Sequence, residues 1–166
     1  MRENPSRDSA GNDPVKRLLI LLLIAAFLLS CASDTEMVVV DTEGEARVVR
    51  VIDGDTIEIE GGARVRYIGI DAPEVYPQTE YYGTEAWAKN RELVEGKTVT
   101  LEKDVTEADV YGRLLRYVYV DGVFVNGELV RLGYARAISY PPDTKYQERL
   151  AQLEEEAREA GRGMWR

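Results

Sequence analysis

Residues 46–73 read ARVVRVIDGDTIEIEGGARVRYIGIDAP, and this stretch decides the fold class. Its first two apolar runs, Ala46–Ile52 and Thr56–Ile59, are rich in the β-branched residues that favour strands. The residues between them, Asp53-Gly54-Asp55, have the composition of a turn. We therefore predict two strands joined at an acidic turn.

The second half of the stretch predicts a third strand and a second acidic turn. Gly61-Gly62 closes a hairpin, and the run Arg64–Ile70 follows it. This run stops at Asp71-Ala72-Pro73 because proline cannot donate a hydrogen bond to a strand ladder. Each acidic turn thus lies where a strand ends.

The rest of the chain adds two strands and three helices. Apolar periodicity and the placement of glycines predict strands over 98–105 and 114–120 and helices over about 84–95, 126–132 and 144–160. A chain of 166 residues has room for about one domain. We predict an α+β fold, mainly β, built as a five-stranded barrel of the OB type with three helices.

The composition narrows the possible chemistry. The sequence contains no histidine and one cysteine. This excludes the Ser/His/Asp triad, histidine-dependent nucleases, the usual zinc hydrolase sites, thiolate metal clusters and intrachain disulfides. Hydrolysis by this chain would have to use carboxylates and a hard metal ion.

The charge also limits how the chain can meet a polyanion. The formal net charge is -9, and residues 1–31 hold four basic and three acidic side chains, so 17 basic and 27 acidic side chains remain. A net charge of -10 over residues 32–166 argues against a broad basic surface that coats nucleic acid. Any attraction to nucleic acid must be local.

The N-terminal segment has the layout of a secretory signal. Lys16 and Arg17 precede the apolar run Leu18–Leu29, which is too short to span a bilayer, and Cys31 follows. Leu28-Leu29-Ser30-Cys31 resembles the lipobox of prokaryotic lipoproteins. We expect a signal peptide over 1–31 with lipidation at Cys31, a polar tether over 32–44 and a domain over 45–166. The protein would be exported and held by lipid at the outer face of a prokaryotic cell membrane, or secreted. A short hydrophobic anchor with an incidental cysteine is the alternative interpretation of the segment.

Three acidic residues are candidates for metal-assisted chemistry. Asp55 and Asp71 each sit at a strand-to-turn junction, and oxygen-only ligation favours calcium or magnesium over zinc. Glu74, three residues beyond Asp71, is placed to accept a proton from a water molecule or to orient it. Taken singly, each of these residues also fits an ordinary turn.

Two arginines are candidates for the phosphate. One guanidinium group can bind two phosphate oxygens at once, and it stays protonated. Arg66 and Arg113 are therefore candidates for binding the phosphate. Tyr111, two residues before Arg113, offers a face on which a base or sugar can stack. The competing interpretation is a solvent-facing strand residue for Arg66 and a surface ion pair for Arg113.

The order of these motifs resembles the staphylococcal nuclease, or thermonuclease, family. The motifs are VIDGDTI at 51–57, Arg66 followed by DAPE at 71–74, and YGR at 111–113. The resemblance continues through further positions of a structural kind: Asn126, Leu129-Val130-Arg131, Gly133, Ala135-Arg136 and Gly163-Met164-Trp165. It covers about Ala46 to Trp165.

The resemblance implies a role for each motif residue. Asp55 and Asp71 match side-chain ligands of one Ca²⁺ ion, and the backbone carbonyl of Ala72 matches a third ligand. Glu74 matches the general base or water-positioning residue. Arg66 and Arg113 match the pair that holds the scissile phosphate.

Further residues match supporting roles. Tyr111 matches a residue of the nucleotide pocket, and Tyr140 is an expected second stacking aromatic, with packing as the alternative. Asp53 is expected to support the metal indirectly. Val110 stands where the best-known relative has a phosphate-binding lysine, so this chain's departures concern substrate affinity rather than chemistry.

The activity implied is calcium-dependent hydrolysis of DNA and RNA that leaves 3′-phosphate ends. We expect single-stranded or open regions to be preferred, and the protein to act as a monomer. The main alternative is a noncatalytic OB-fold lipoprotein that binds nucleic acid or protein, because this barrel also serves for binding alone. A lipoprotein that only tethers partners would leave the Asp55, Asp71 and Glu74 arrangement unexplained.

Overall fold

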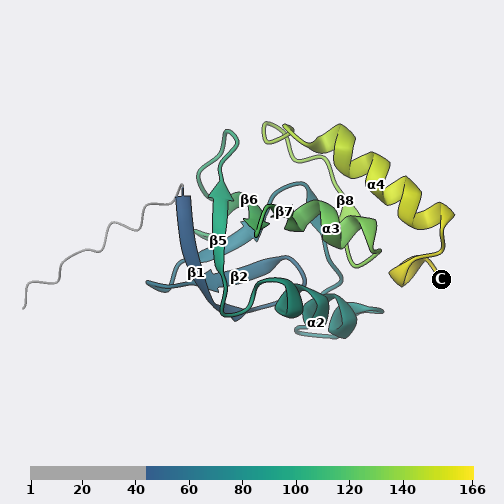
Figure 1. Cartoon of the computed structure of the whole chain (residues 1–166), viewed down its shortest axis with the longest axis horizontal. Coiled ribbons are helices and arrows are strands. Elements are labelled where there is room, and N and C mark those ends of the chain that lie inside the picture. The colour runs from purple at the N-terminus through teal and green to yellow at the C-terminus, as the bar shows by residue number, and fades with distance from the viewer. Residues whose placement is uncertain (1–43) are drawn as a thin grey trace, which may run out of the picture. The chain divides into compact units, whose positions relative to one another are not determined.

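The computed structural model describes residues 44–166 (Figure 1). The strands are β1 (Gly44–Val51), β2 (Thr56–Ile59), β3 (Arg64–Tyr67), β4 (Ile70–Asp71), β5 (Thr98–Glu102), β6 (Leu114–Val120), β7 (Val123–Phe124) and β8 (Arg136–Ala137). The helices are α2 (Gly83–Val94), α3 (Val125–Arg131) and α4 (Gln147–Glu159), and a 3₁₀ turn, η1, covers Gly163–Trp165.

Five of the strands close into a barrel. The hydrogen-bonded order is β3-β2-β1-β5-β6, and β6 returns to pair with β3 in parallel, with Val65 opposite Leu114. All other pairings in this ring are antiparallel. The predicted five-stranded OB-type barrel with three helices is therefore confirmed.

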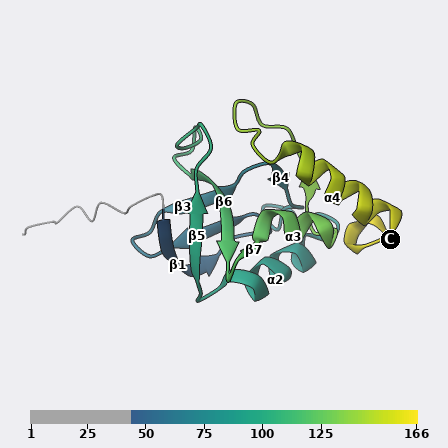
Figure 2. The same ribbon diagram turned by 45° about the horizontal axis from the view of Figure 1, so that its top comes forward.

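The barrel interior is filled by the apolar residues of the alternating strands. Val48, Ile57, Ile59 and Val65 are fully buried there. Helix α3 packs against β6 on one side and α4 on the other (Figure 2). The helices thus cover one end of the barrel and extend its core.

A buried asparagine joins helix α3 to the barrel. The side-chain oxygen of Asn126 accepts a hydrogen bond from the backbone amide of Val118 at 2.9 Å. Its amide group donates to the carbonyl of Ile68, also at 2.9 Å. Val118 lies within β6 and Ile68 directly follows β3, so the side chain of Asn126 satisfies two buried backbone groups of the barrel.

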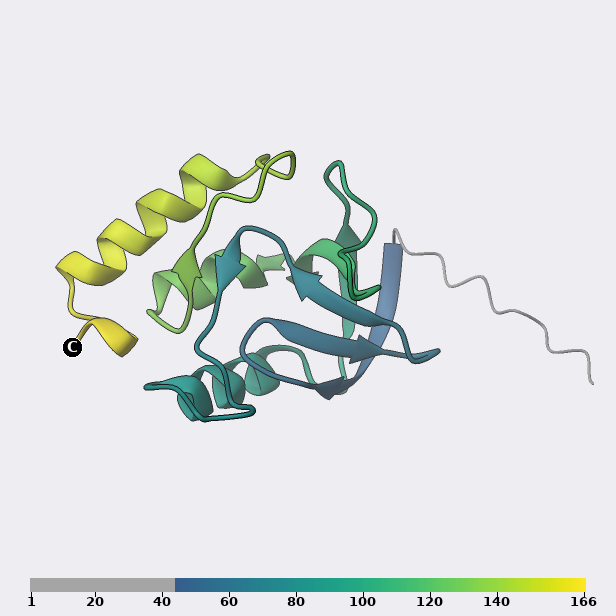
Figure 3. The same ribbon diagram turned by 180° about the vertical axis from the view of Figure 1, so that it is seen from behind.

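The predicted third strand, Arg64–Ile70, is corrected to two shorter ones. Figure 3 shows the β2–β3 hairpin leading through a bend into the short strand β4, which pairs with β8. The bend contains Gly69, whose φ is 76° and where a Cβ would lie 2.7 Å from the side chain of Leu150. The chain therefore needs glycine there, and Asp71 leaves the barrel on its own strand.

Smaller differences concern element ends. The predicted strand 98–105 stops at Glu102, and the predicted helix 144–160 begins at Gln147. Gly44, assigned to the tether, is the first residue of β1. The predicted signal peptide, Cys31 and residues 32–43 lie outside the described part. Among residues 44–166, no helix is long and apolar enough to cross a membrane.

Candidate active site

The turn between β1 and β2 places Asp55 inside the protein. The backbone amide of Asp55 donates to the carboxylate of Asp53 at 3.0 Å, which shapes the turn. Gly54 is required because a Cβ there would lie 2.5 Å from that of Ala72. The close contact between the two turns leaves Asp55 only 4% exposed.

A second set of hydrogen bonds holds the turn between β1 and β2. The hydroxyl of Tyr67 donates to the side-chain oxygen of Asn90 at 3.0 Å, and the Asn90 amide group donates to the carbonyl of Asp53, also at 3.0 Å. Asn90 comes from helix α2, and both side chains are buried. The sequence interpretation missed this support, because an asparagine within a helix carries no local signal of its partner.

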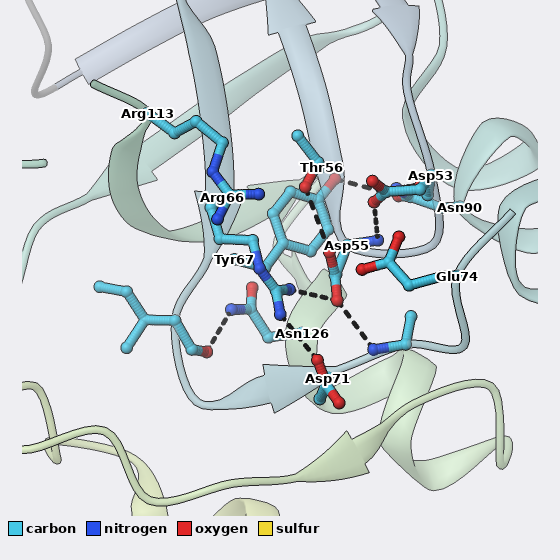
Figure 4. A network of polar contacts seen from close by, with 12 residues as sticks. Asp53, Asp55, Thr56, Arg66, Tyr67, Asp71, Glu74, Asn90, Arg113 and Asn126 are labelled. Carbon is cyan, nitrogen blue, oxygen red and sulfur yellow. Dashed lines mark hydrogen bonds and ion pairs between the residues drawn. The ribbon is translucent and has the colours of Figure 1, made fainter. Parts of the chain in front are cut away.

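Asp55, Arg66 and Asp71 form one connected group (Figure 4). The Asp55 carboxylate accepts a hydrogen bond from the amide of Ala72 at 2.7 Å and forms an ion pair with Arg66. The Arg66 Nη2 group lies 2.9 Å from the Asp71 carboxylate. The two acidic turns predicted from the sequence therefore meet, and one guanidinium spans them.

Burial makes ionisation of the Asp55 carboxyl group unfavourable unless positive charge lies close to it. Burial raises the pKa of Asp55 to about 8, and the nearby Asp53 charge acts in the same direction, while Arg66 and the Ala72 amide oppose them. An ionised carboxylate at this place is costly unless further positive charge lies beside it. A divalent cation would supply that charge.

The donor set fits a hard cation. Carboxylate oxygens of Asp55 and Asp71 and a backbone carbonyl are the ligand types that Ca²⁺ and Mg²⁺ prefer. Across residues 44–166, no three acidic side chains already form a closed metal cluster. Because Ca²⁺ takes about six to eight oxygen ligands, a cation held by these residues would keep coordination positions open to other oxygen donors.

Glu74 lies beside this group on the segment that follows β4 (Figure 4). Its backbone is fixed at both ends: the Glu74 amide donates to the Glu80 carboxylate at 3.2 Å, and the Glu80 amide donates to the Glu74 carbonyl at 2.9 Å. Burial raises the pKa of the Glu74 carboxyl group, and the Asp53 charge adds to that effect. A raised pKa makes this carboxylate a better proton acceptor.

The position of Glu74 also depends on a glycine. A Cβ at Gly83, the first residue of α2, would lie 2.4 Å from the carbonyl oxygen of Glu74. Only glycine lets the helix start so close to this backbone. The sequence interpretation missed the contact.

Arg113 is held by a residue that the sequence interpretation did not single out. Asp109 accepts hydrogen bonds from the Arg113 Nε at 2.7 Å and from its backbone amide at 3.0 Å. Burial alone would raise the pKa of Asp109, but these hydrogen bonds and the Arg113 charge outweigh it and the pKa is lowered. Asp109 therefore stays ionised and fixes Arg113. Its position four residues before Arg113 in a turn was the available signal.

A pocket of about 190 Å³ is lined by four of the predicted site residues, and we call it the central pocket. Arg66, Asp71 and Arg113 line it, as does Tyr140, which is 48% exposed. Tyr140, Arg66 and Arg113 thus reach one cavity although they come from three separate segments. The geometry would let one phosphate contact both arginines.

Tyr111 lies in a different place. It is 81% exposed and lines a neighbouring pocket of about 490 Å³, the Tyr111 pocket, together with Arg64 and Arg113. The Arg113 guanidinium lies 5.5 Å from the centre of the Tyr111 ring. Arg113 forms a wall of both pockets, so Tyr111 adjoins the central pocket rather than lining it.

Comparison with known proteins shows which family this chain resembles. The profile of the family described as Staphylococcal nuclease homologue matches residues 64–166. The chain is 36% identical over 160 residues to the Thermonuclease of Staphylococcus hyicus, covering 89% of this chain and 95% of that protein. It is 40% identical over 132 residues to the Thermonuclease of Staphylococcus intermedius, covering 75% of this chain and 79% of that protein.

A further relative comes from a different genus. The Endonuclease YncB of Bacillus subtilis is 40% identical over 124 residues, which cover 70% of this chain and 59% of that protein. The family profile, the identities and the closed barrel agree with one another. The chain belongs to the staphylococcal nuclease family.

Proposed function

We propose that this chain is a calcium-dependent nuclease that hydrolyses phosphodiester bonds of DNA and RNA and leaves 3′-phosphate ends. The observation that carries the proposal is the group formed by Asp55, Arg66 and Asp71, with Arg113 lining the same pocket as Arg66 and Asp71. Membership of a family whose relatives are named thermonucleases and endonucleases supports the nuclease assignment.

Calcium would be held by the carboxylates of Asp55 and Asp71 and by the backbone carbonyl of Ala72. When bound, the ion would supply positive charge to the phosphate oxygens and make a neighbouring water molecule easier to deprotonate. The hydrogen bond from the Ala72 amide to Asp55 keeps these residues adjacent. Asp53 supports the site indirectly by shaping the Asp55 turn.

The two arginines would bind the scissile phosphate from both sides of the central pocket. Cleavage adds negative charge to the nonbridging oxygens, and guanidinium groups meet that charge without losing a proton. Asp109 takes the Nε hydrogen of Arg113, and the Nη groups of Arg113 are left for the phosphate. Arg113 would also stabilise the leaving oxygen.

Glu74 would accept the proton of the attacking water. Its carboxylate lies beside Asp53 and Asp55, so water between these groups and the phosphate is within its reach (Figure 4). The tyrosines would contribute binding: Tyr140 in the central pocket and Tyr111 beside it. Stacking on aromatic rings suits single-stranded or open nucleic acid.

The experiment that tests the proposal separates cleavage from binding. Purified protein is incubated with single- and double-stranded DNA and RNA in Ca²⁺, in Mg²⁺ and with a chelator, and the products are sized. Fragments formed with Ca²⁺ should resist 3′ extension by a polymerase until a phosphatase removes the terminal phosphate. Binding without fragments in Ca²⁺ would instead support the noncatalytic OB-fold alternative.

We also propose that the protein acts as an exported monomer anchored through lipid at Cys31. The support is the apolar run Leu18–Leu29 followed by Cys31. Several acyl chains attached to one cysteine anchor a protein stably at a membrane. The variant Cys31→Ser should move the protein from the membrane fraction to the soluble fraction. A variant that still sediments with membranes would favour an uncleaved anchor.

A further inference from the structure

We propose that a second pocket, lined by Tyr81, Arg136 and Trp165, binds the part of a single-stranded polynucleotide that continues beyond the scissile phosphate. This inference rests on the proposed function, because it extends the path of the same substrate. The pocket has a volume of about 400 Å³, and we call it the Tyr81 pocket.

The Tyr81 pocket adjoins the central pocket through a shared wall. Asp71 lines both cavities. Arg136 in β8 stands directly opposite Asp71 in β4, and residues opposite one another in an antiparallel pair project from the same face. The guanidinium of Arg136 therefore lies on the side where Asp71 meets the central pocket.

The segment that starts with Arg136 runs along both pockets. Arg136 lines the Tyr81 pocket, while Ile138 and Tyr140 line the central one. The Ile138 amide donates to the carbonyl of Gly69 at 3.0 Å, so the pairing of β8 with β4 continues past Ala137. Alternate residues of this extended segment thus form one side of a continuous track.

The charge of Arg136 is available for a ligand. Several cations of the chain are neutralised by a neighbouring carboxylate, as Arg131 is by Glu128 and Arg158 by Glu154. Within residues 44–166, Arg136 has no carboxylate at ion-pair distance, and its guanidinium lies 5.6 Å from the ring of Trp165. In an acidic protein, such an exposed guanidinium is a local point of attraction for phosphate.

Tyr81 supplies the second element of a strand-binding site. Its ring is 72% exposed and lies 5.7 Å, between ring centres, from the tilted ring of Tyr82. A single exposed tyrosine needs no explanation. An exposed ring and a free arginine in one pocket beside the scissile site are the two features that bind single strands without reading sequence.

The acidic residues in the Tyr81 pocket both have partners in the catalytic group. The Glu80 carboxylate accepts the backbone amide of Glu74, and the Asp71 carboxylate is paired with Arg66. Both negative charges are therefore directed to the catalytic group. Arg136 is the charged side chain that remains for the substrate in this pocket.

The test compares a long with a short substrate. For each variant, kcat/KM is measured in Ca²⁺ on a single-stranded octanucleotide and on a dinucleotide with one phosphodiester, which leaves the Tyr81 pocket empty. Tyr81→Ala and Arg136→Met should each lower the octanucleotide-to-dinucleotide ratio about tenfold, a loss within the range found for removing one stacked base. Tyr81→Phe keeps the ring and should restore the ratio.

A matched control and a binding assay complete the design. Arg47→Met removes an exposed arginine of β1 that lines none of the three pockets, and its ratio should equal that of the wild type. In a Glu74→Gln background, the Kd for a labelled octanucleotide should rise about tenfold for Tyr81→Ala and Arg136→Met. Because Tyr81 is exposed, its variant tests the pocket even where Arg136→Met fails to fold.

The outcomes distinguish failure of the proposed function from failure of the Tyr81 pocket. A wild-type protein that cleaves neither substrate overturns the proposed function, and the binding assay still tests the pocket. Cleavage with an unchanged ratio and an unchanged Kd in Tyr81→Ala overturns the Tyr81 pocket and leaves the proposed function intact.

Discussion

The carboxylate of Asp55 accepts a hydrogen bond of 2.7 Å from the backbone amide of Ala72, 17 positions further along the chain. This bond joins the turn before β2 to the end of β4, and these are the two acidic turns that carry the proposed calcium ligands. The Gly54 backbone beside it has no space for a Cβ, so the contact is close-packed as well as polar. The chemistry proposed for the site depends on that junction.

Removing one proposed ligand should weaken the response to calcium. Asp71 is the suitable choice because its side chain is 54% exposed and its loss leaves the core unchanged. We expect Asp71→Asn to raise the Ca²⁺ concentration for half-maximal cleavage at least about tenfold. Asp121→Asn, an exposed turn residue outside the pockets, is the control. An unaltered calcium requirement in Asp71→Asn would remove Asp71 from the ligand set.

The planar guanidinium of Arg113 should matter beyond its charge. Arg113→Lys keeps the charge but loses the fork that contacts two phosphate oxygens. We expect kcat to fall about 100-fold with an unchanged circular dichroism spectrum. Arg131→Lys, where the arginine is paired with Glu128 on α3, is the matched control. Equal losses in the two variants would contradict the role of Arg113.

The buried asparagine should be important for stability rather than activity. Asn126→Ala leaves the Val118 amide and the Ile68 carbonyl without partners. Each unsatisfied buried group costs about 1–3 kcal/mol, so the free energy of unfolding should drop by about 2–6 kcal/mol. Urea unfolding measures it, with the exposed Gln152→Ala as a control. A drop below 1 kcal/mol would mean that water or rearrangement replaces both bonds.

Asp143 should make stability depend on pH. Its Oδ1 accepts the amides of Val105 and Thr106 at 2.9 Å and 2.8 Å. Burial raises the pKa of Asp143, but the hydrogen bonds from Thr106 and Val105 outweigh it and the pKa is lowered. The stabilisation is therefore complete above the unfolded pKa of about 3.9 and is lost as the pH falls through the lower folded pKa.

The variant Asp143→Asn tests this dependence. At pH 7 its free energy of unfolding should be about 1 kcal/mol lower than that of the wild type, because the charge-assisted hydrogen bonds become neutral ones. The difference should shrink as the pH drops below about 4. Urea unfolding at a series of pH values measures it, and a difference that stays constant down to the acid limit would contradict the assignment.

Much of the fold could be predicted because local patterns agree with it. β-branched runs, paired glycines and the proline after Asp71 predicted the first three barrel strands, and apolar periodicity predicted β5 and β6. The parallel closure of β3 on β6 could not be predicted, since strand pairing leaves no local trace. The break at Gly69 depends on Leu150, a contact between distant segments.

The candidate site was predictable in its motifs but not in its supports. The five residues with proposed chemistry lie together, whereas Tyr111, a predicted binding residue, adjoins the central pocket rather than lining it. Arg116 shows why residues that hold the structure in place could not be predicted from the sequence. In an alternating strand it resembles a surface residue, yet it is fully buried and donates to the carbonyls of Glu107 and Leu115. Burial of a charge depends on partners that only the fold brings near.

The most direct test of the central claim is the initial rate of single-stranded DNA cleavage by wild type and Glu74→Gln in Ca²⁺ and with excess chelator. We expect rapid cleavage by the wild type in Ca²⁺, none with chelator, and a rate at least about 100-fold lower for Glu74→Gln. Undiminished cleavage with chelator, or equal rates for the two proteins in Ca²⁺, would contradict it.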